Sequence, residues 1–265
     1  MEKILKYALV TGASSGIGWH FAELLAKKGY SLVAVSNQPE RLAELKKKLE
    51  QEDRIIVEII NIDLARENSA IEVFDYCRKK NLEIEVLIND AGMFFFGESA
   101  RVDSSRMKSM IMLHVLTPTL LCRFFGEQMI SRKKGYILNV SSISAVMPYP
   151  GISVYGPTKA YLRHFTRALR TEMKYNGINV TCLIPGATDT GLYDAGKFKS
   201  SLLLKLGIMK KPAVVAAKGI RALFNNRAES IPGLLNKLVV ALLPLIPNFI
   251  ISTINRKTNV VRKNS

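Results

Sequence analysis

Short apolar runs alternate along this chain with longer amphipathic stretches. The runs hold consecutive apolar residues, as in YALV at 7–10, which is typical of strands that are buried on both faces. In the longer stretches apolar residues recur three and four positions apart, as at Phe21, Leu24 and Leu25, which is typical of helices. The pattern predicts strands at 4–11, 31–36, 55–61, 85–89, 136–140 and 179–184, a first helix ending near 28, and further helices at 39–52, 67–79, 104–132, 155–175 and 212–224.

This alternation predicts an α/β fold. Strands linked by helices form a parallel sheet covered on both faces, which describes a single doubly wound, Rossmann-type domain. A chain of 265 residues with 48% hydrophobic residues is long enough for one such domain. We expect residues 1–192 to form the catalytic part and residues 193–265 a substrate lid and a hydrophobic helical extension of the same domain, with the lid at 191–210.

Charge and cysteine content narrow the function classes. The formal net charge of +16 suggests nucleic acid, anionic lipid or an anionic cofactor as a partner. No nucleic-acid motif accompanies the charge, so no nucleic-acid partner is expected, and a gel shift would test that alternative. Cys77, Cys122 and Cys182 have no metal-ligand or CxxC spacing, which predicts buried thiols, no metal site and a reducing compartment. No signal peptide precedes the first strand, so a cytoplasmic location is expected.

A glycine-rich turn, TGASSGIG at 11–18, lies between the first predicted strand and the first helix. Glycines in such a turn let the backbone approach a pyrophosphate, and the helix N-terminus offers free N–H groups to it. A tight turn without a ligand is the alternative for one motif of this kind. The residues expected to bind a dinucleotide here are Gly12, Ser14, Ser15, Gly16, Ile17 and Gly18.

Ser142, Tyr155 and Lys159 are spaced for proton transfer to a carbonyl group. Tyr155 and Lys159 are four residues apart, so on a helix they share one face. A phenol has a reference pKa of about 10, and a nearby ammonium lowers this pKa because it favours the phenolate. The Ser142 hydroxyl can hold the substrate oxygen while the tyrosine gives or takes the proton. This set needs a hydride carrier, and the glycine-rich turn would bind one.

The ends of the second and third predicted strands bear on the choice of dinucleotide. After strand two an acid selects NAD and an arginine selects NADP. This chain has Asn37 with neutral neighbours there and Arg41 nearby, so we expect NADP in preference to NAD. After strand three, Asp63 is expected either to contact the adenine amino group or to cap the next helix.

Taken together, these motifs resemble the short-chain dehydrogenase/reductase family over residues 4–192. The glycine-rich turn is similar to the family's cofactor turn, NDAG at 89–92 to its NNAG motif, and Tyr155 with Lys159 to its YxxxK motif, preceded by Ser142 at the usual distance. Pro185-Gly186 with Thr190 resembles the segment that holds the nicotinamide carboxamide.

The resemblance implies a sheet of seven parallel strands and hydride transfer between NAD(P) and a carbonyl or alcohol. In it Tyr155 would be the general acid/base, Lys159 would lower its pKa and hold the nicotinamide ribose, and Ser142 would orient the substrate oxygen. Family analogy also suggests a homodimer or homotetramer through the helices at 104–132 and 155–175. The further cofactor-binding residues that it implies are Asn89, Ala91, Gly92, Pro185, Gly186 and Thr190, beside Tyr155 and Lys159.

Two residues depart from the family pattern. His114 stands where the family usually has an asparagine that completes a proton relay. Imidazole also donates and accepts hydrogen bonds, so His114 is expected either to act as a catalytic residue in that relay or to pack at a helix interface. Asp90 replaces an asparagine, and since a carboxylate cannot donate as an amide does, the bonding there must differ.

The substrate side is apolar. Phe94, Phe95 and Phe96 are expected either to line a pocket or to pack under their loop, and Met147 and Tyr149 add to the apolar rim. We therefore expect an apolar ketone or secondary alcohol as substrate, such as a 3-ketoacyl chain or a steroid-like ketone. The alternative is a catalytically silent NAD(P)-binding regulator or scaffold, which the unusual His114 would suit and the intact Ser-Tyr-Lys set argues against.

The end of the chain holds an apolar run at 231–254, interrupted by Lys237, Pro244 and Pro247 and followed by basic residues at 256, 257, 262 and 263. Its length is about that of a membrane span, but the prolines and the lysine argue against a simple spanning helix. We expect either an interfacial helix on anionic lipid, which would place the protein at the inner face of a membrane, or a flap over the cleft or a subunit contact.

Overall fold

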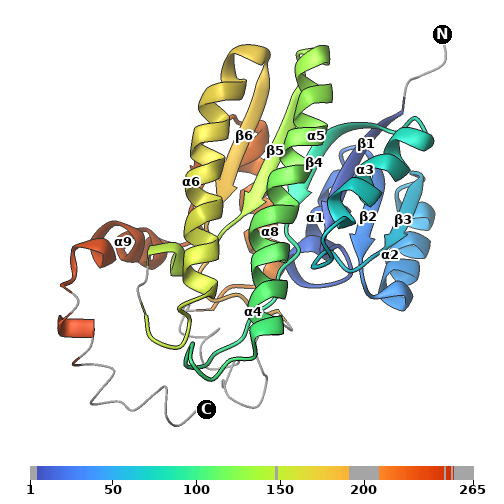
Figure 1. Cartoon of the computed structure of the whole chain (residues 1–265). Helices are drawn as coiled ribbons and strands as arrows, with labels where there is room; N and C mark the ends of the chain where they lie inside the picture. The colour runs from blue at the N-terminus through green and yellow to red at the C-terminus, as the bar shows by residue number, and fades with distance from the viewer. Residues whose placement is uncertain (1–4, 147–148, 191–208, 248, 252, 254–265) are drawn as a thin grey trace.

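Seven parallel strands form one sheet in the computed structural model, which describes residues 5–146, 149–190, 209–247, 249–251 and 253 (Figure 1). The strand order is β3-β2-β1-β4-β5-β6-β7, and every neighbouring pair is parallel. The strands are β1 (Lys6–Thr11), β2 (Ser31–Ser36), β3 (Val57–Asn61), β4 (Glu83–Asn89), β5 (Gly135–Val140), β6 (Ile178–Leu183) and β7 (Glu229–Ser230). The predicted α/β class is confirmed, and the seventh strand is one that the apolar pattern did not locate.

Helices cover both faces of this sheet (Figure 1). One apolar cluster joins the sheet to α1, α2 and α8, and a second joins it to α3, α5 and α6. Neighbouring strand residues take part in different clusters, as Val10 does in the first and Leu9 in the second, because side chains of a strand alternate between the two faces. The helices are α1 (Gly16–Ala26), α2 (Pro39–Glu52), α3 (Ser69–Lys79), α4 (Ser104–Ile111), α5 (Thr117–Arg132), α6 (Tyr155–Met173), α8 (Pro212–Phe224) and α9 (Leu234–Leu242).

The long helix predicted at 104–132 is divided by one π-helical turn, η1 (Met112–Leu116), between α4 and α5. Pro118 explains the break, since it lacks the N–H that would bond to the carbonyl of residue 114 in a regular helix. Of the helices that the structure describes, this combined run is long and apolar enough to cross a membrane by composition. Phe125 and Met129 pack it into the core, however, so it is a core helix.

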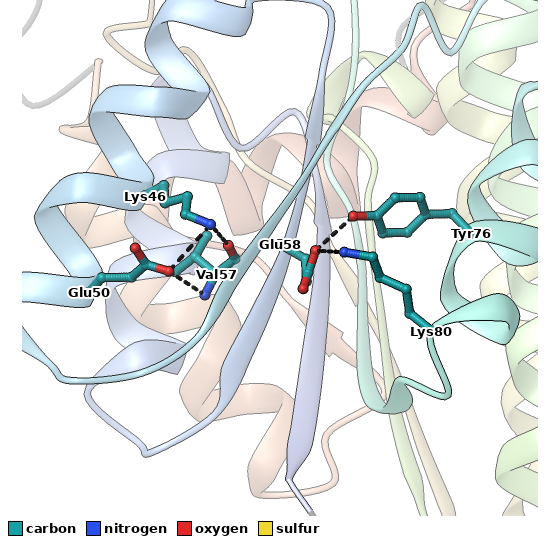
Figure 2. Close-up of polar contacts among 6 residues, drawn as sticks. All are labelled: Lys46, Glu50, Val57, Glu58, Tyr76 and Lys80. Carbon is teal, nitrogen blue, oxygen red and sulfur yellow. Dashed lines mark hydrogen bonds and ion pairs between the residues drawn. The ribbon is translucent and has the colours of Figure 1, made fainter.

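The sheet edge at β3 is held by side chains from the helices on both faces (Figure 2). Lys46 Nζ of α2 donates to the carbonyl oxygen of Val57 at 2.8 Å. On the opposite face, the Glu58 carboxylate accepts from the Tyr76 hydroxyl at 2.7 Å and from Lys80 Nζ at 2.6 Å. The carbonyl group of Val57 at the outer edge of β3 is thereby occupied, which is one way in which proteins protect an edge strand.

Several predicted boundaries shift by two residues. β3 begins at Val57, β4 at Glu83 and α3 at Ser69, because the strand and helix ends depend on neighbours that a local pattern does not include. The lid expected at 191–210 lies outside the described residues except for its last two positions. Of these, Lys210 forms an isolated parallel bridge with Thr188.

Candidate active site

A cleft of about 520 Å³ lies at the carboxyl ends of the strands, where ligands bind in open α/β sheets. It brings together residues from segments as distant as the first turn and the end of β6. Sixteen of the eighteen predicted site residues line it: Gly12, Ser14, Ser15, Gly16, Ile17, Asn37, Asp63, Ala91, Gly92, His114, Ser142, Tyr155, Lys159, Pro185, Gly186 and Thr190.

The other two, Gly18 and Asn89, do not line the cleft but lie behind its wall. A methyl group at Gly18 would lie 2.2 Å from the carbonyl oxygen of Gly12, so this glycine permits close packing of the turn. Asn89 Nδ2 donates to Asn139 Oδ1 at 2.8 Å and to Cys122 Sγ at 3.3 Å. Both residues therefore support the wall from inside the fold, and their contact with a cofactor stays a prediction.

The glycine-rich turn fits a pyrophosphate by its backbone. Gly12 has φ +70°, and a Cβ there would lie 3.0 Å from the backbone of Ala91, so a side chain would fill the space where the turn meets the β4 loop. Ser15 at the N-cap of α1 makes no side-chain cap hydrogen bond, and the first turn holds no acid. The N–H groups and positive dipole end of α1 are thus available to an anion in the cleft.

The end of the cleft beyond β2 is polar and neutral. Ser14 Oγ and Ser36 Oγ lie 2.8 Å apart, and Asn37 lines the cleft beside them. Arg41 is not among the lining residues, because its guanidinium lies over the Trp19 ring at 5.1 Å from the centroid. The two residues directly after β2, Asn37 and Gln38, are neutral, so neither side chain would repel a 2′-phosphate.

Asp63 lines the cleft with its side chain turned toward its own loop. Its Oδ1 accepts from the N–H of Ala65 at 2.9 Å. The cap that was considered for Asp63 is wrong, because α3 begins at Ser69 with Asn68 as its N-cap. Contact with an adenine amino group stays a prediction.

The three residues of the proposed proton transfer line the same cleft as the glycine-rich turn. Tyr155 is buried at the start of α6, and Lys159 follows one turn later with Nζ 5.9 Å from the phenol ring centroid. Lys159 Nζ donates to the carbonyl oxygen of Val140 at 3.0 Å. Ser142, just after β5, accepts at Oγ from the N–H of Ser144 at 3.1 Å. The helical spacing and the strand end thus place all three residues on one cleft, and their roles in catalysis stay a prediction.

Two opposite charges lie within the wall behind this set. Burial lowers the pKa of Lys159 to about 8, although the Asp90 carboxylate opposes the shift. Burial raises the pKa of Asp90 to about 7, against the effects of the Lys159 charge and of a hydrogen bond from the Gly18 backbone. Asp90 also lines the cleft. The departure from asparagine therefore places a carboxylate where it supports the protonated state of Lys159.

His114 is buried and hydrogen-bonded at both ring nitrogens. Nε2 accepts from the N–H of Met93 at 3.0 Å, and Nδ1 lies 3.1 Å from Thr158 Oγ1. The Thr158 hydroxyl donates to the carbonyl oxygen of Tyr155 at 2.8 Å, which requires the imidazole proton to be on Nδ1. Burial and the Lys159 charge lower the pKa of His114 well below its usual value, so the ring is neutral. It connects the β4 loop, the π-helical turn and the start of α6.

The three phenylalanines pack behind the cleft and are not among the residues that line it. Phe95 is buried in a cluster with Tyr155, and Phe96 lies against Gly151, where an added Cβ would approach its ring within 2.4 Å. Phe94 meets the Tyr155 ring edge to face, with ring centroids 5.0 Å apart. The packing alternative agrees with this arrangement, and it holds the phenol ring in place. Met147 of the expected rim lies outside the described residues.

Sequence reasoning missed two residues that shape the cleft. Thr11 Oγ1 accepts from the N–H groups of Asp90 and Ala91 at 3.0 and 3.1 Å, which ties the end of β1 to the β4 loop. Asn236 of α9 lies against Gly186, where a Cβ would approach its Nδ2 within 2.4 Å. A threonine at the end of a buried strand was a usable signal for the first, whereas no local pattern indicates the second.

The three cysteines are free and buried, as predicted. Burial raises the pKa of Cys77, Cys122 and Cys182 to about 12 in each case. A thiol with so high a pKa is not a nucleophile at neutral pH. These three cysteines are therefore not candidate nucleophiles.

Comparisons with known proteins agree with this geometry. Residues 6–197 match the family model for short chain dehydrogenases. The very-long-chain 3-oxoacyl-CoA reductase-A of Danio rerio is 34% identical over 190 residues, 69% of this chain and 58% of that protein. The 17-beta-hydroxysteroid dehydrogenase type 3 of Mus musculus is 31% identical over 189 residues, 70% and 61%.

A solved structure is similar over most of its length. The short-chain dehydrogenase from Sphingobium yanoikuyae in complex with NADPH has a TM-score of 0.79 and 29% identity, covering 87% of this chain and 89% of that one. By contrast, the chain spans about three fifths of the length of the two vertebrate relatives.

Proposed function

Because this chain belongs to the short-chain dehydrogenase/reductase family of NAD(P)-dependent oxidoreductases, we propose that it reduces an apolar ketone with NADPH, or runs the reverse reaction on the secondary alcohol. The observation that carries the proposal is that Ser142, Tyr155 and Lys159 line the same cleft as the glycine-rich turn. A proton donor and a dinucleotide site in one cleft are what carbonyl reduction requires.

The chain's own residues handle the proton and the substrate oxygen. The Ser142 hydroxyl donates a hydrogen bond to the ketone oxygen and orients it. Tyr155 transfers its phenolic proton to that oxygen, and the Lys159 ammonium stabilises the phenolate that remains. A bound nicotinamide dinucleotide would supply the hydride that adds to the carbonyl carbon. Hydride and proton together convert the ketone into a secondary alcohol.

His114 acts in this proposal as a positioning residue. Its two hydrogen bonds hold Met93 on one side and, through Thr158, the carbonyl of Tyr155 on the other. Since both nitrogens are engaged with protein groups and the ring is neutral, the imidazole fixes the phenol and does not carry protons.

NADPH is proposed over NADH from the neutral end of the cleft at Ser14, Ser36 and Asn37. Serine hydroxyls donate to a phosphate, and the similar Sphingobium yanoikuyae structure is a complex with NADPH. Asn37→Asp would test this: the ratio of kcat/KM for NADPH to that for NADH should fall at least about tenfold through repulsion of the 2′-phosphate. An unchanged ratio would contradict the assignment.

The proposed substrate is a ketone with a long or bulky apolar group. The relatives named for 3-oxoacyl-CoA and 17-beta-hydroxysteroid substrates support this class. A panel of 3-oxoacyl thioesters, steroid ketones and small ketones, followed by NADPH absorbance, separates the choices. Turnover of the larger substrates alone is expected. Tight NADPH binding without turnover of any ketone or alcohol would instead support the silent regulator.

We also propose that copies of the chain associate through α5 and α6. Ile130 of α5 and Tyr161 of α6 are exposed, and the Tyr161 ring stacks on Phe165. Apolar side chains exposed on neighbouring helices suit a subunit contact. Analytical ultracentrifugation of the wild type and of Tyr161→Asp would test it, with dissociation of an oligomer expected for the variant.

A further inference from the structure

Helix α9 has two opposite faces. Asn236 and Val240 are buried on one face. Four leucines lie within about one quarter of the helix circumference on the other face and point away from the protein. This leucine face consists of Leu234, Leu235, Leu238 and Leu242, exposed by 75, 57, 51 and 58%. Leu245 and Phe249 extend it and are also exposed. Such a contiguous apolar surface marks an interaction site.

The buried face attaches the helix to the rim of the cleft. Val240 packs with Ile184 at the end of β6, and Asn236 lies against Gly186. Asn236 Nδ2 also donates to the carbonyl oxygen of Pro232 at 2.6 Å, which fixes the entry into the helix. Figure 1 shows α9 at the outer edge of the molecule. The leucine face is therefore held in a defined position beside the cleft.

Charge identifies the partner. Residues 191–265 contain thirteen Lys and Arg and two Asp and Glu, a net charge of +11 out of the total of +16. After Glu229 the chain has five basic residues and no acid. Lys237 lies on α9 itself, and the Lys210 side chain lies near Gly233 at its start. Leucines flanked by cations are the pattern of a helix that lies in the surface of an anionic bilayer.

A second copy of the chain fits this face less well. A symmetric contact would place α9 against α9, and therefore one acid-free basic segment against another. Like charges brought together in this way repel, whereas an anionic lipid surface neutralises them. The helix is also short: α9 ends at Leu242, and Pro244 in the next turn interrupts its continuation. Its length and its basic surroundings suit an interfacial position better than a spanning one.

We propose that the chain docks on an anionic membrane through the leucine face of α9, with the Gly186 rim of the cleft next to the lipid. An apolar ketone dissolved in the bilayer would then reach the cleft without crossing water, a consequence that rests on the proposed function. The docking itself does not depend on catalysis, because it involves none of Ser142, Tyr155 and Lys159.

Flotation of the full chain with vesicles tests the docking. The vesicles contain phosphatidylcholine alone, or phosphatidylcholine with about one-third phosphatidylglycerol. We expect the wild type to float with the anionic vesicles and to remain behind with the neutral ones. Leu235→Ser/Leu238→Ser/Leu242→Ser should reduce the bound fraction at least about tenfold, because it removes the inserted surface. The matched control Ile56→Ser/Ile71→Ser/Tyr175→Ser changes three exposed apolar side chains elsewhere and should float like the wild type.

The docking would be overturned if the wild type did not float, or if the leucine triple variant floated as well as the wild type. It would also be overturned if neither protein bound vesicles and the wild type formed an oligomer that the three leucine substitutions, but not the control substitutions, dissociated. That last result would assign the face to a second copy. Tyr155→Phe separates this inference from the proposed function, since it should float normally while losing turnover. A chain that floats but reduces no ketone would refute the proposed function and leave the docking intact.

Discussion

Helices α8 and α9 have similarly apolar sequences and opposite surroundings. α8 packs against both α1 and the sheet, and Gly219 lies close to both Phe21 and Leu183, where a larger residue would be crowded. α9 buries only Asn236 and Val240 of its nine residues and turns its leucines outward. An apolar amphipathic stretch thus predicts a helix whose apolar face is buried by something. Whether the protein core or an external partner buries it depends on which elements the fold places beside the helix.

The same difference separates the two sides of the cleft. The catalytic side is built from core elements, with Lys159 held by the carbonyl of Val140 at the end of β5. The Gly186 side is supported by α9, whose other face is open. We expect substitutions on the first side to change chemistry or folding, and substitutions on the leucine face to change neither.

The largest expected effect is that of Tyr155→Phe, on the catalytic side of the cleft. Removal of the phenolic proton should lower kcat at least about 100-fold, the range of general acid catalysis. NADPH binding, measured by fluorescence titration, should stay near the wild-type value because the ring remains in its cluster. If the variant kept most of the wild-type rate, Tyr155 would not be the general acid.

A pair of leucine substitutions tests the comparison of the two helices directly. Leu223→Ala in α8 should lower the free energy of unfolding by about 2–5 kcal/mol, because it leaves a cavity in the core. Leu238→Ala in α9 should change it by less than about 0.5 kcal/mol, since the side chain is exposed. Urea unfolding measures both, and equal losses would mean that α9 belongs to the core.

His114→Ala should lower kcat about tenfold by releasing the loop and helix that the ring connects. Since the ring is neutral and holds its partners without titrating, the midpoint of the pH–rate profile should not move. His114→Asn, which restores a donor and an acceptor, should recover part of the rate. An unchanged rate for the alanine variant would limit His114 to packing, and a shifted midpoint would instead support a relay.

The smallest expected effect concerns pH. Ketone reduction requires protonated Lys159, so kcat/KM should fall as the pH rises through about 8. The Asp90 carboxylate raises the pKa of Lys159, and its removal in Asp90→Asn should therefore move the fall to lower pH. The groups that act on this amine are Asp90 and Cys182, of which Asp90, with a pKa of about 7, is the one that is mainly charged at the pH of this fall. A shift to higher pH would refute the pairing.

Much of the fold and the site could be predicted because their signals are local. Consecutive apolar residues marked six of the seven strands, and the four-residue spacing placed Tyr155 and Lys159 on one helix face. The pattern did not predict β7, because this strand consists of two residues, Glu229 and Ser230, which form no apolar run. Their strand exists only because β6 offers an edge to pair with.

By itself, the sequence determined the α/β class, the glycine-rich turn and the Ser-Tyr-Lys set, since periodicity and short spacings express local geometry. Only the tertiary structure decided that Asn89 faces Asn139 and not the cleft, that both nitrogens of His114 are engaged, and that Asn236 supports Gly186. These contacts join residues that are tens of positions apart. Their partners are selected by how strands and helices pack, and no pattern within either segment records the other.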